Sequence, residues 1–107
     1  MEHRISPRSK TNVSLTVQRG RSTFRARCVE LSQTGMLVLA PKAFRDSAWP
    51  YLSAKLALPS GVVSVLARRV GLRGDKVAYA FVVLDEASEA RLTDFLFEQV
   101  TSRRRAA

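Results

Sequence analysis

The chain has few of the residues from which catalytic and metal sites are built. It contains one cysteine and one histidine in 107 residues, so it can form neither an internal disulfide nor a cluster of Cys and His ligands. His3 has no neighbouring pattern of carboxylates that would orient it for acid–base catalysis. P-loop and G-x-G-x-x-G phosphate motifs are also absent. The sequence therefore predicts a protein that is not an enzyme and that needs no metal or cofactor.

Long apolar runs are missing as well. No stretch approaches the ~20 apolar residues that a membrane-spanning helix needs, and residues 1–4 do not begin an apolar signal segment. We therefore expect a cytoplasmic protein. The lone Cys28 lies in a run of alternating apolar residues, which predicts a buried core thiol and not a reactive one.

Acidic residues are scarce, with nine Asp and Glu against eighteen Lys and Arg, and the net charge is +9. The imbalance is local. The chain before Asp85 contains fourteen basic and four acidic residues, whereas the chain from Asp85 onward contains four basic and five acidic residues. A basic body attracts anions, such as a dinucleotide, a nucleic acid or an acidic partner surface. Charge alone does not choose among them.

What is present is a regular alternation of apolar and polar residues, typical of half-buried strands, in a chain long enough for one domain. Turn signals fall at 19–21, 59–61 and 74–75, and 42–50 reads as a loop or one helical turn in which Trp49 plugs the edge of the core. The predicted strands cover residues 13–18, 24–28, 36–40, 52–58, 62–73 and 76–84.

The alternation shifts phase at two places. Val29 and Leu31 are apolar, while Glu30 falls on the face of Cys28. A bulge or strand end near residue 29 would explain the shift and would turn Glu30 from an inward position towards the barrel mouth. A second shift at Arg68–Arg69 indicates another bulge.

Residues after 84 have helical spacing. Asp85 can cap the helix, and Glu86 and Glu89 suit the positive end of its dipole. Phe97 lies off the apolar stripe, so it is either a dimer contact or a second core contact, and the chain is either a monomer or a homodimer. Because the strand 76–84 is apolar on both faces, we expect this helix to cover its outer face. The stripe consists of Leu92, Phe95, Leu96 and Val100.

Two motifs carry candidate binding residues. The N-terminal arm holds Arg4 and Arg8 in the pattern R-x-x-x-R, and Pro7 between them forbids a regular helix. Arginine stacks on rings and grips phosphate or a purine edge with paired donors. The second motif, E-x-S-x-x-G from Glu30 to Gly35, offers a carboxylate suited to adjacent N–H donors and a glycine free to take positive φ at a turn. Ser32 within it can either bond the turn backbone or face a ligand.

Taken with the small all-β chain, these motifs resemble the PilZ domain family over nearly the whole chain, here residues 2–102. The resemblance implies a six-stranded antiparallel β-barrel of the split-barrel type, with one C-terminal helix, in a bacterial receptor for cyclic di-GMP. It divides the chain into an arm (1–11), a barrel (12–84), and a helix with a basic tail (85–107). The family has Asp or Asn where this chain has Glu30, which moves the carboxylate by one methylene.

The resemblance also implies which residues would hold the ligand. Arg4 and Arg8 would grip guanine and phosphate, and Glu30 would accept from guanine N1 and N2. Ser32 would bond a base or phosphate through its hydroxyl or backbone N–H, and Gly35 would let the backbone turn close to the ligand. A protein partner in motility or surface-polysaccharide machinery would read the occupied state.

Two other functions remain open. Glu30 favours a PilZ-fold interaction module whose nucleotide site is degenerate and does not bind. The net charge favours a small basic barrel that binds nucleic acid, but most aromatic residues fall at core positions, and stacking platforms need exposed rings. Nucleic acid is therefore the less favoured partner.

Overall fold

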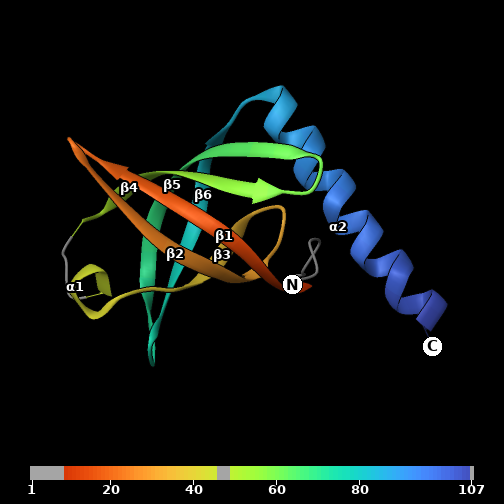
Figure 1. Cartoon of the computed structure of the whole chain (residues 1–107), viewed down its shortest axis with the longest axis horizontal. Coiled ribbons are helices and arrows are strands. Elements are labelled where there is room, and N and C mark those ends of the chain that lie inside the picture. The colour runs from red at the N-terminus through yellow and green to blue at the C-terminus, as the bar shows by residue number, and fades with distance from the viewer. Residues whose placement is uncertain (1–8, 46–48, 107) are drawn as a thin grey trace, which may run out of the picture.

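A computed structural model describes residues 9–45 and 49–106 and shows a closed barrel followed by a helix (Figure 1). The six strands lie in the order β1-β2-β3-β6-β5-β4, and each pairs antiparallel with its neighbours, which confirms the predicted architecture. The elements are β1 (Ser9–Arg19), β2 (Ser22–Leu31), β3 (Gly35–Leu39), α1 (Lys42–Arg45), β4 (Tyr51–Leu58), β5 (Gly61–Arg73), β6 (Lys76–Leu84) and α2 (Glu86–Ala106).

The strand β1 begins earlier than the alternation of its side chains predicts. It starts at Ser9, and two of its residues, Thr11 and Asn12, stand against a single residue of β2 between the paired positions on either side. Such a bulge interrupts the two-residue period, so the first part of the strand does not show it. Its position matters because Ser9 lies opposite Leu31 at the end of β2.

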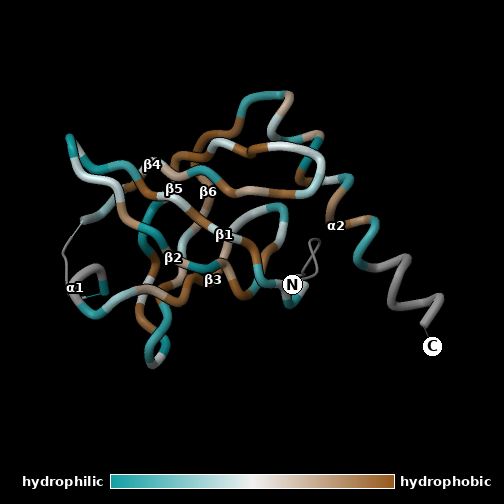
Figure 2. Tube along the Cα trace, in the orientation of Figure 1, coloured by the Kyte–Doolittle hydropathy of each residue, from teal (hydrophilic) through white to brown (hydrophobic). Residues whose placement is uncertain are grey.

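Tight turns join the hairpins where glycines predicted them. Gly20 between β1 and β2 has φ 59°, and Gly74 between β5 and β6 has φ 66°, in the left-handed region that glycine adopts without steric cost. Figure 2 shows both turns as hydrophilic, teal ends of their hairpins.

The barrel interior is filled by the inward side chains of all six strands. Cys28 is fully buried, as predicted, and its thiol donates to the carbonyl oxygen of Glu30 at 3.2 Å. Burial raises the pKa of Cys28 to about 12, so the thiol stays protonated in the folded protein. Trp49 packs against the edge of this core with its ring 5.5 Å from that of Phe24, which confirms its predicted place. The Arg19 guanidinium lies over the Trp49 ring, 4.6 Å from the ring centre.

The helix α2 does not cover the outer face of β6, and that expectation was wrong. It packs mainly against β5, with a smaller contact to β1, while Val82 and Val83 of β6 remain 50% and 55% exposed. Two hydrogen bonds fix the helix there: the Ser64 N–H donates to Ser88 Oγ at 3.0 Å, and the Arg91 guanidinium donates to the Val62 carbonyl at 3.2 Å. The stripe residues Leu92, Phe95 and Leu96 join the barrel core.

The ends of α2 also bear on the predictions. Asp85 caps the helix, because its Oδ1 accepts from the Ser88 N–H at 2.7 Å. The helix continues through the predicted basic tail as far as Ala106. Phe97 is 71% exposed, so its side chain lies outside the buried core, and a dimer contact stays a prediction. Among the described residues, neither helix combines the length and the apolarity that crossing a bilayer requires.

Candidate functional site

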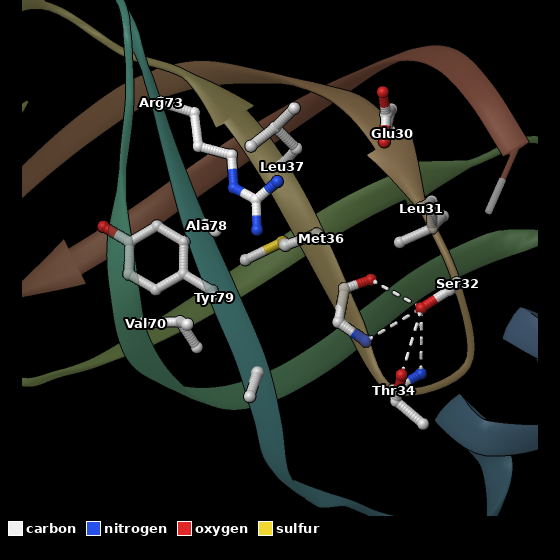
Figure 3. A pocket seen from close by; sticks show the side chains of 12 residues that line it. Glu30, Leu31, Ser32, Thr34, Met36, Leu37, Val70, Arg73, Ala78 and Tyr79 are labelled. Atoms are coloured by element: carbon white, nitrogen blue, oxygen red, sulfur yellow. Dashed lines mark hydrogen bonds between the residues drawn. The ribbon is translucent and has the colours of Figure 1, made fainter. Parts of the chain in front are cut away.

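The turn between β2 and β3 is held by Ser32. Its backbone N–H donates to the Gly35 carbonyl at 2.9 Å, and its Oγ accepts from the backbone N–H groups of Thr34 at 3.2 Å and Gly35 at 3.1 Å (Figure 3). The side chain is only 5% exposed. Of the two roles that the sequence left open, the structure shows that Ser32 bonds the turn backbone.

Gly35 is needed for a different reason from the one that the sequence indicated. It does not have positive φ; among the described residues only Gly20, Gly61 and Gly74 do. Gly35 is the first residue of β3, opposite Ala80 of β6, and a Cβ there would overlap the carbonyl oxygen of Tyr79. Glycine at this position therefore permits a close approach of two backbones.

Glu30 reaches the site through the predicted bulge. The β2–β3 register shifts between Cys28, which faces Val38, and Glu30, which faces Leu37. The extra residue of β2 turns the half-buried Glu30 out of the barrel interior. Figure 3 shows its carboxylate at the edge of a pocket, as the prediction of a position at the barrel mouth requires.

The pocket has a volume of about 160 Å³ and lies between the β2–β3 turn, the C-terminal part of β5 and the middle of β6. Glu30, Ser32 and Gly35, three of the five predicted site residues, line it together. The structure therefore brings the whole E-x-S-x-x-G motif to one cavity. The complete lining is Glu30, Leu31, Ser32, Thr34, Gly35, Met36, Leu37, Val70, Arg73, Ala78, Tyr79 and Ala80.

Sequence reasoning did not identify Arg73 and Tyr79, two polar side chains in the lining of the pocket. Arg73, the last residue of β5, extends its guanidinium over the pocket, and Tyr79 of β6 forms part of the wall (Figure 3). Burial raises the pKa of Tyr79 to about 12, against an opposing effect of the nearby Arg69 cation. In the sequence Arg73 is one of many arginines beside a turn and Tyr79 is one of many apolar strand residues. Only the pairing of β3 with β6 places them here.

Arg4 and Arg8 lie outside the described residues. The site nevertheless fixes where their segment is attached: Ser9 pairs with Leu31, and Lys10 pairs with Glu30. The first described residue of β1 is therefore adjacent to the E-x-S-x-x-G motif. The described residues contain no group of three or more His, Cys, Asp or Glu side chains that could hold a metal ion.

Comparison with known proteins agrees with this arrangement. The sequence pattern of the PilZ domain matches residues 2–98. The chain belongs to the PilZ domain family. PilZ domains are cyclic di-GMP-binding receptor and adaptor domains and not enzymes. No curated protein matches this PilZ chain in sequence.

Solved structures show the same fold at low sequence identity. The Bacillus subtilis inhibitor of motility, MotI/DgrA, superposes with a TM-score of 0.84 at 13% identity, over 97% of this PilZ chain and 54% of its own. The PilZ domain of YcgR from Escherichia coli, solved with c-di-GMP, has a TM-score of 0.72 at 17% identity, over 98% and 97% of the two chains. The K. pneumonia MrkH–c-di-GMP complex has a TM-score of 0.67 at 13% identity, over 100% and 57%. This PilZ chain thus spans about half the length of MotI/DgrA and of MrkH.

Proposed function

We propose that this PilZ chain is a cyclic di-GMP receptor that binds the dinucleotide between the N-terminal R-x-x-x-R arm and the E-x-S-x-x-G turn. The observation that carries the proposal is the register of β1 on β2. Because Ser9 lies opposite Leu31, Arg8 is one residue away from a strand position beside the motif. The arm and the turn can then reach one ligand from the two sides of the pocket.

Each residue has a role that follows from its chemistry. Arg4 and Arg8 would stack on guanine and grip its N7/O6 edge or a phosphate. Glu30, at the pocket edge, would accept from guanine N1 and N2. The Ser32 N–H donates to the Gly35 carbonyl, and its nearly buried hydroxyl accepts from the N–H groups of Thr34 and Gly35, so Ser32 would act by holding the turn in shape. The pocket is small, about 160 Å³, so it would take one base or phosphate and leave the rest of the dinucleotide to the arm.

Signalling would follow from ordering of the arm on the ligand, since fixing a segment in one conformation costs entropy that only the bound state offsets. A protein partner would read the ordered state. The structural neighbour MotI/DgrA is described as an inhibitor of motility, which supports a partner in motility machinery. A partner in surface-polysaccharide machinery stays an implication of the family resemblance alone.

Titration calorimetry with cyclic di-GMP tests the proposal. Replacing Arg4→Ala and Arg8→Ala together should weaken binding by about a hundredfold or more, because each charged hydrogen bond contributes about 1.5–3 kcal/mol. The double variant Arg21→Ala with Arg25→Ala removes the same charge away from the site and should bind like the unchanged protein. Absence of binding by the unchanged protein, or equal heats with the arm variant, would refute the roles.

The second candidate, an interaction module with a degenerate site, is favoured by one observation: Glu30 occupies the pocket edge where the family motif has the shorter Asp or Asn. The substitution Glu30→Asp separates the two functions. A gain in affinity from undetectable to measurable would mean that the native site is degraded. Tight binding by the native chain, with little change on substitution, would support the receptor.

A further inference from the structure

The outer face of β1, β2, β4 and β5 forms a surface rich in cations. The strand register joins its members: Arg25 of β2 faces Thr16 of β1, which faces Lys55 of β4, which in turn faces Ser64 of β5. Side chains two residues apart on a strand share a face, so Arg27 continues this surface along β2. Leu66 and Arg68 continue it along β5. We call the surface defined by Arg25, Arg27, Lys55, Leu66 and Arg68 the cationic wall.

The cationic wall lacks opposing charge. The four strands that form it contain one acidic residue, Glu30, and that residue lies at the pocket edge. Cross-strand neighbours of the cations are hydroxyl-bearing: Ser14 faces Arg27, and Thr16 faces Arg25. Opposite charges on neighbouring strands stabilise a sheet. The four strands place no carboxylate opposite a cation of the wall, so the wall has a positive potential on its outer side.

An aliphatic strip borders the cations. Leu66 is 37% exposed and pairs with Val83 of β6, which is 55% exposed, and the adjacent Val82 is 50% exposed. Contiguous exposed apolar side chains rimmed by charge mark interaction surfaces. The helix α2 leaves this strip uncovered because it packs elsewhere along β5.

The combination favours a protein over other anions. Single-stranded nucleic acid binds through several exposed rings on which successive bases stack, whereas the wall has one exposed ring beside it, that of Tyr51, which lies opposite Arg68. Anionic membranes bind surfaces that bury a broad apolar face with Trp, Phe and Leu below the headgroups, whereas the strip offers one leucine and two valines. A protein surface can offer carboxylates and aliphatic groups side by side.

We propose that the cationic wall is the docking surface for an acidic protein partner that presents Asp and Glu around an aliphatic patch. None of the five defining residues lines the nucleotide pocket, so partner and dinucleotide can bind together. The strand β2 joins the two, since it carries Arg25 and Arg27 on the wall and Glu30 at the pocket. The inference supplies the partner surface that the proposed function needs and in that respect rests on it, but its test omits the nucleotide, so the two can fail separately.

The test measures binding of a fluorescent amphipathic peptide with glutamate on one face and leucine on the other, by anisotropy at low salt. The double reversal Arg25→Glu with Lys55→Glu should weaken binding by about tenfold or more. Its control, Arg21→Glu with Lys76→Glu, makes the same change of net charge off the wall and should weaken binding by about threefold at most. Leu66→Asn should weaken binding severalfold with no change of charge. Circular dichroism and thermal melting confirm that each variant is folded.

Other results overturn the proposal. No binding by the unchanged protein, equal losses in the two charge-reversed variants, or no effect of Leu66→Asn would each do so. The same holds if a single-stranded oligonucleotide or phosphatidylserine vesicles bind more tightly than the peptide and lose that binding with the wall variant. Calorimetry with cyclic di-GMP on the wall variant then reports the nucleotide site independently.

Discussion

The backbone of Gly35, at the start of β3, lies so close to the Tyr79 carbonyl on β6 that a Cβ at position 35 would overlap the oxygen. This contact joins the β2–β3 turn to the opposite wall of the pocket. Replacing Gly35→Ala must push the two strands apart or distort the turn that Ser32 holds. Backbone atoms cannot move aside as the end of a flexible side chain can.

We therefore expect Gly35→Ala to destabilise the fold by about 1–3 kcal/mol, the usual cost of overpacking. Gly71→Ala is the matched control, because Gly71 lies in β5, on the other side of β6, with nothing within 4 Å of a Cβ and without positive φ. It should change stability by less than about 1 kcal/mol. Urea denaturation measures both, and equal effects of the two substitutions would contradict the close contact.

Ser32→Ala should loosen the same turn. It removes the oxygen that accepts from the N–H groups of Thr34 and Gly35, in a side chain that is nearly buried. Leaving such donors unsatisfied costs about 1–3 kcal/mol. Denaturant unfolding gives the cost, and Ser53→Ala on the exposed face of β4 should be nearly neutral. A neutral Ser32→Ala would show that the turn does not depend on the hydroxyl.

Cys28 makes stability depend on alkaline pH. Its pKa is about 12 in the folded protein against 9.0 for an ordinary thiol, because burial disfavours the thiolate. Below pH 9 the thiol is protonated in both states. Above it only the unfolded chain loses the proton, so unfolding becomes easier as pH rises towards 12, by up to about 1.4 kcal/mol per pH unit.

Urea midpoints measured from pH 8 to 11 check this. Cys28→Val removes the titrating thiol and should flatten the decline just above pH 9. A part should remain above pH 10, since burial also raises the pKa of Tyr79 from 10.0 to about 12. A decline of the same slope in both proteins from pH 9 would show that the thiol is not responsible.

Asp85 fixes the start of α2 and, through Ser88, its attachment to β5. Asp85→Ala removes the acceptor of the Ser88 N–H and should cost about 1 kcal/mol. Asp85→Asn keeps a capping oxygen and should retain most of the stability. Thermal melting of the two variants distinguishes them; the prediction fails if Asn is as costly as Ala.

Local pattern was enough for much of the fold. The two-residue alternation marked all six strands and buried Cys28, and the phase shift at Glu30 located the bulge that turns it outwards. Asp85 was recognisable as a cap because capping depends on residues three apart in the chain. Such features are set by neighbours along the sequence, so they can be read from it.

Features that depend on distant strands could not be predicted. The apolar sequence of β6 indicates that another element could cover it. It does not indicate that α2 packs against β5 instead, where the Ser64 N–H donates to Ser88 Oγ. Glycine at position 35 is compatible with a turn and with a close approach, and only its closeness to the Tyr79 carbonyl tells which. Arg73 became a pocket residue because β6, its hairpin partner, pairs with β3, which is distant in the chain, and not through any motif.

The sequence by itself determined most of each strand, the bulge beside Glu30, the cap and the chemistry of the two motifs, because these follow from short-range periodicity and from the side chains themselves. Tertiary structure decided which of these residues meet. Barrel closure brings β3 against β6 and so creates the pocket, and the same closure sets Arg25, Lys55 and Leu66 on one outer wall. The physical reason is that hydrogen-bond register between strands far apart in the chain is fixed by packing of the shared core, which no local pattern encodes.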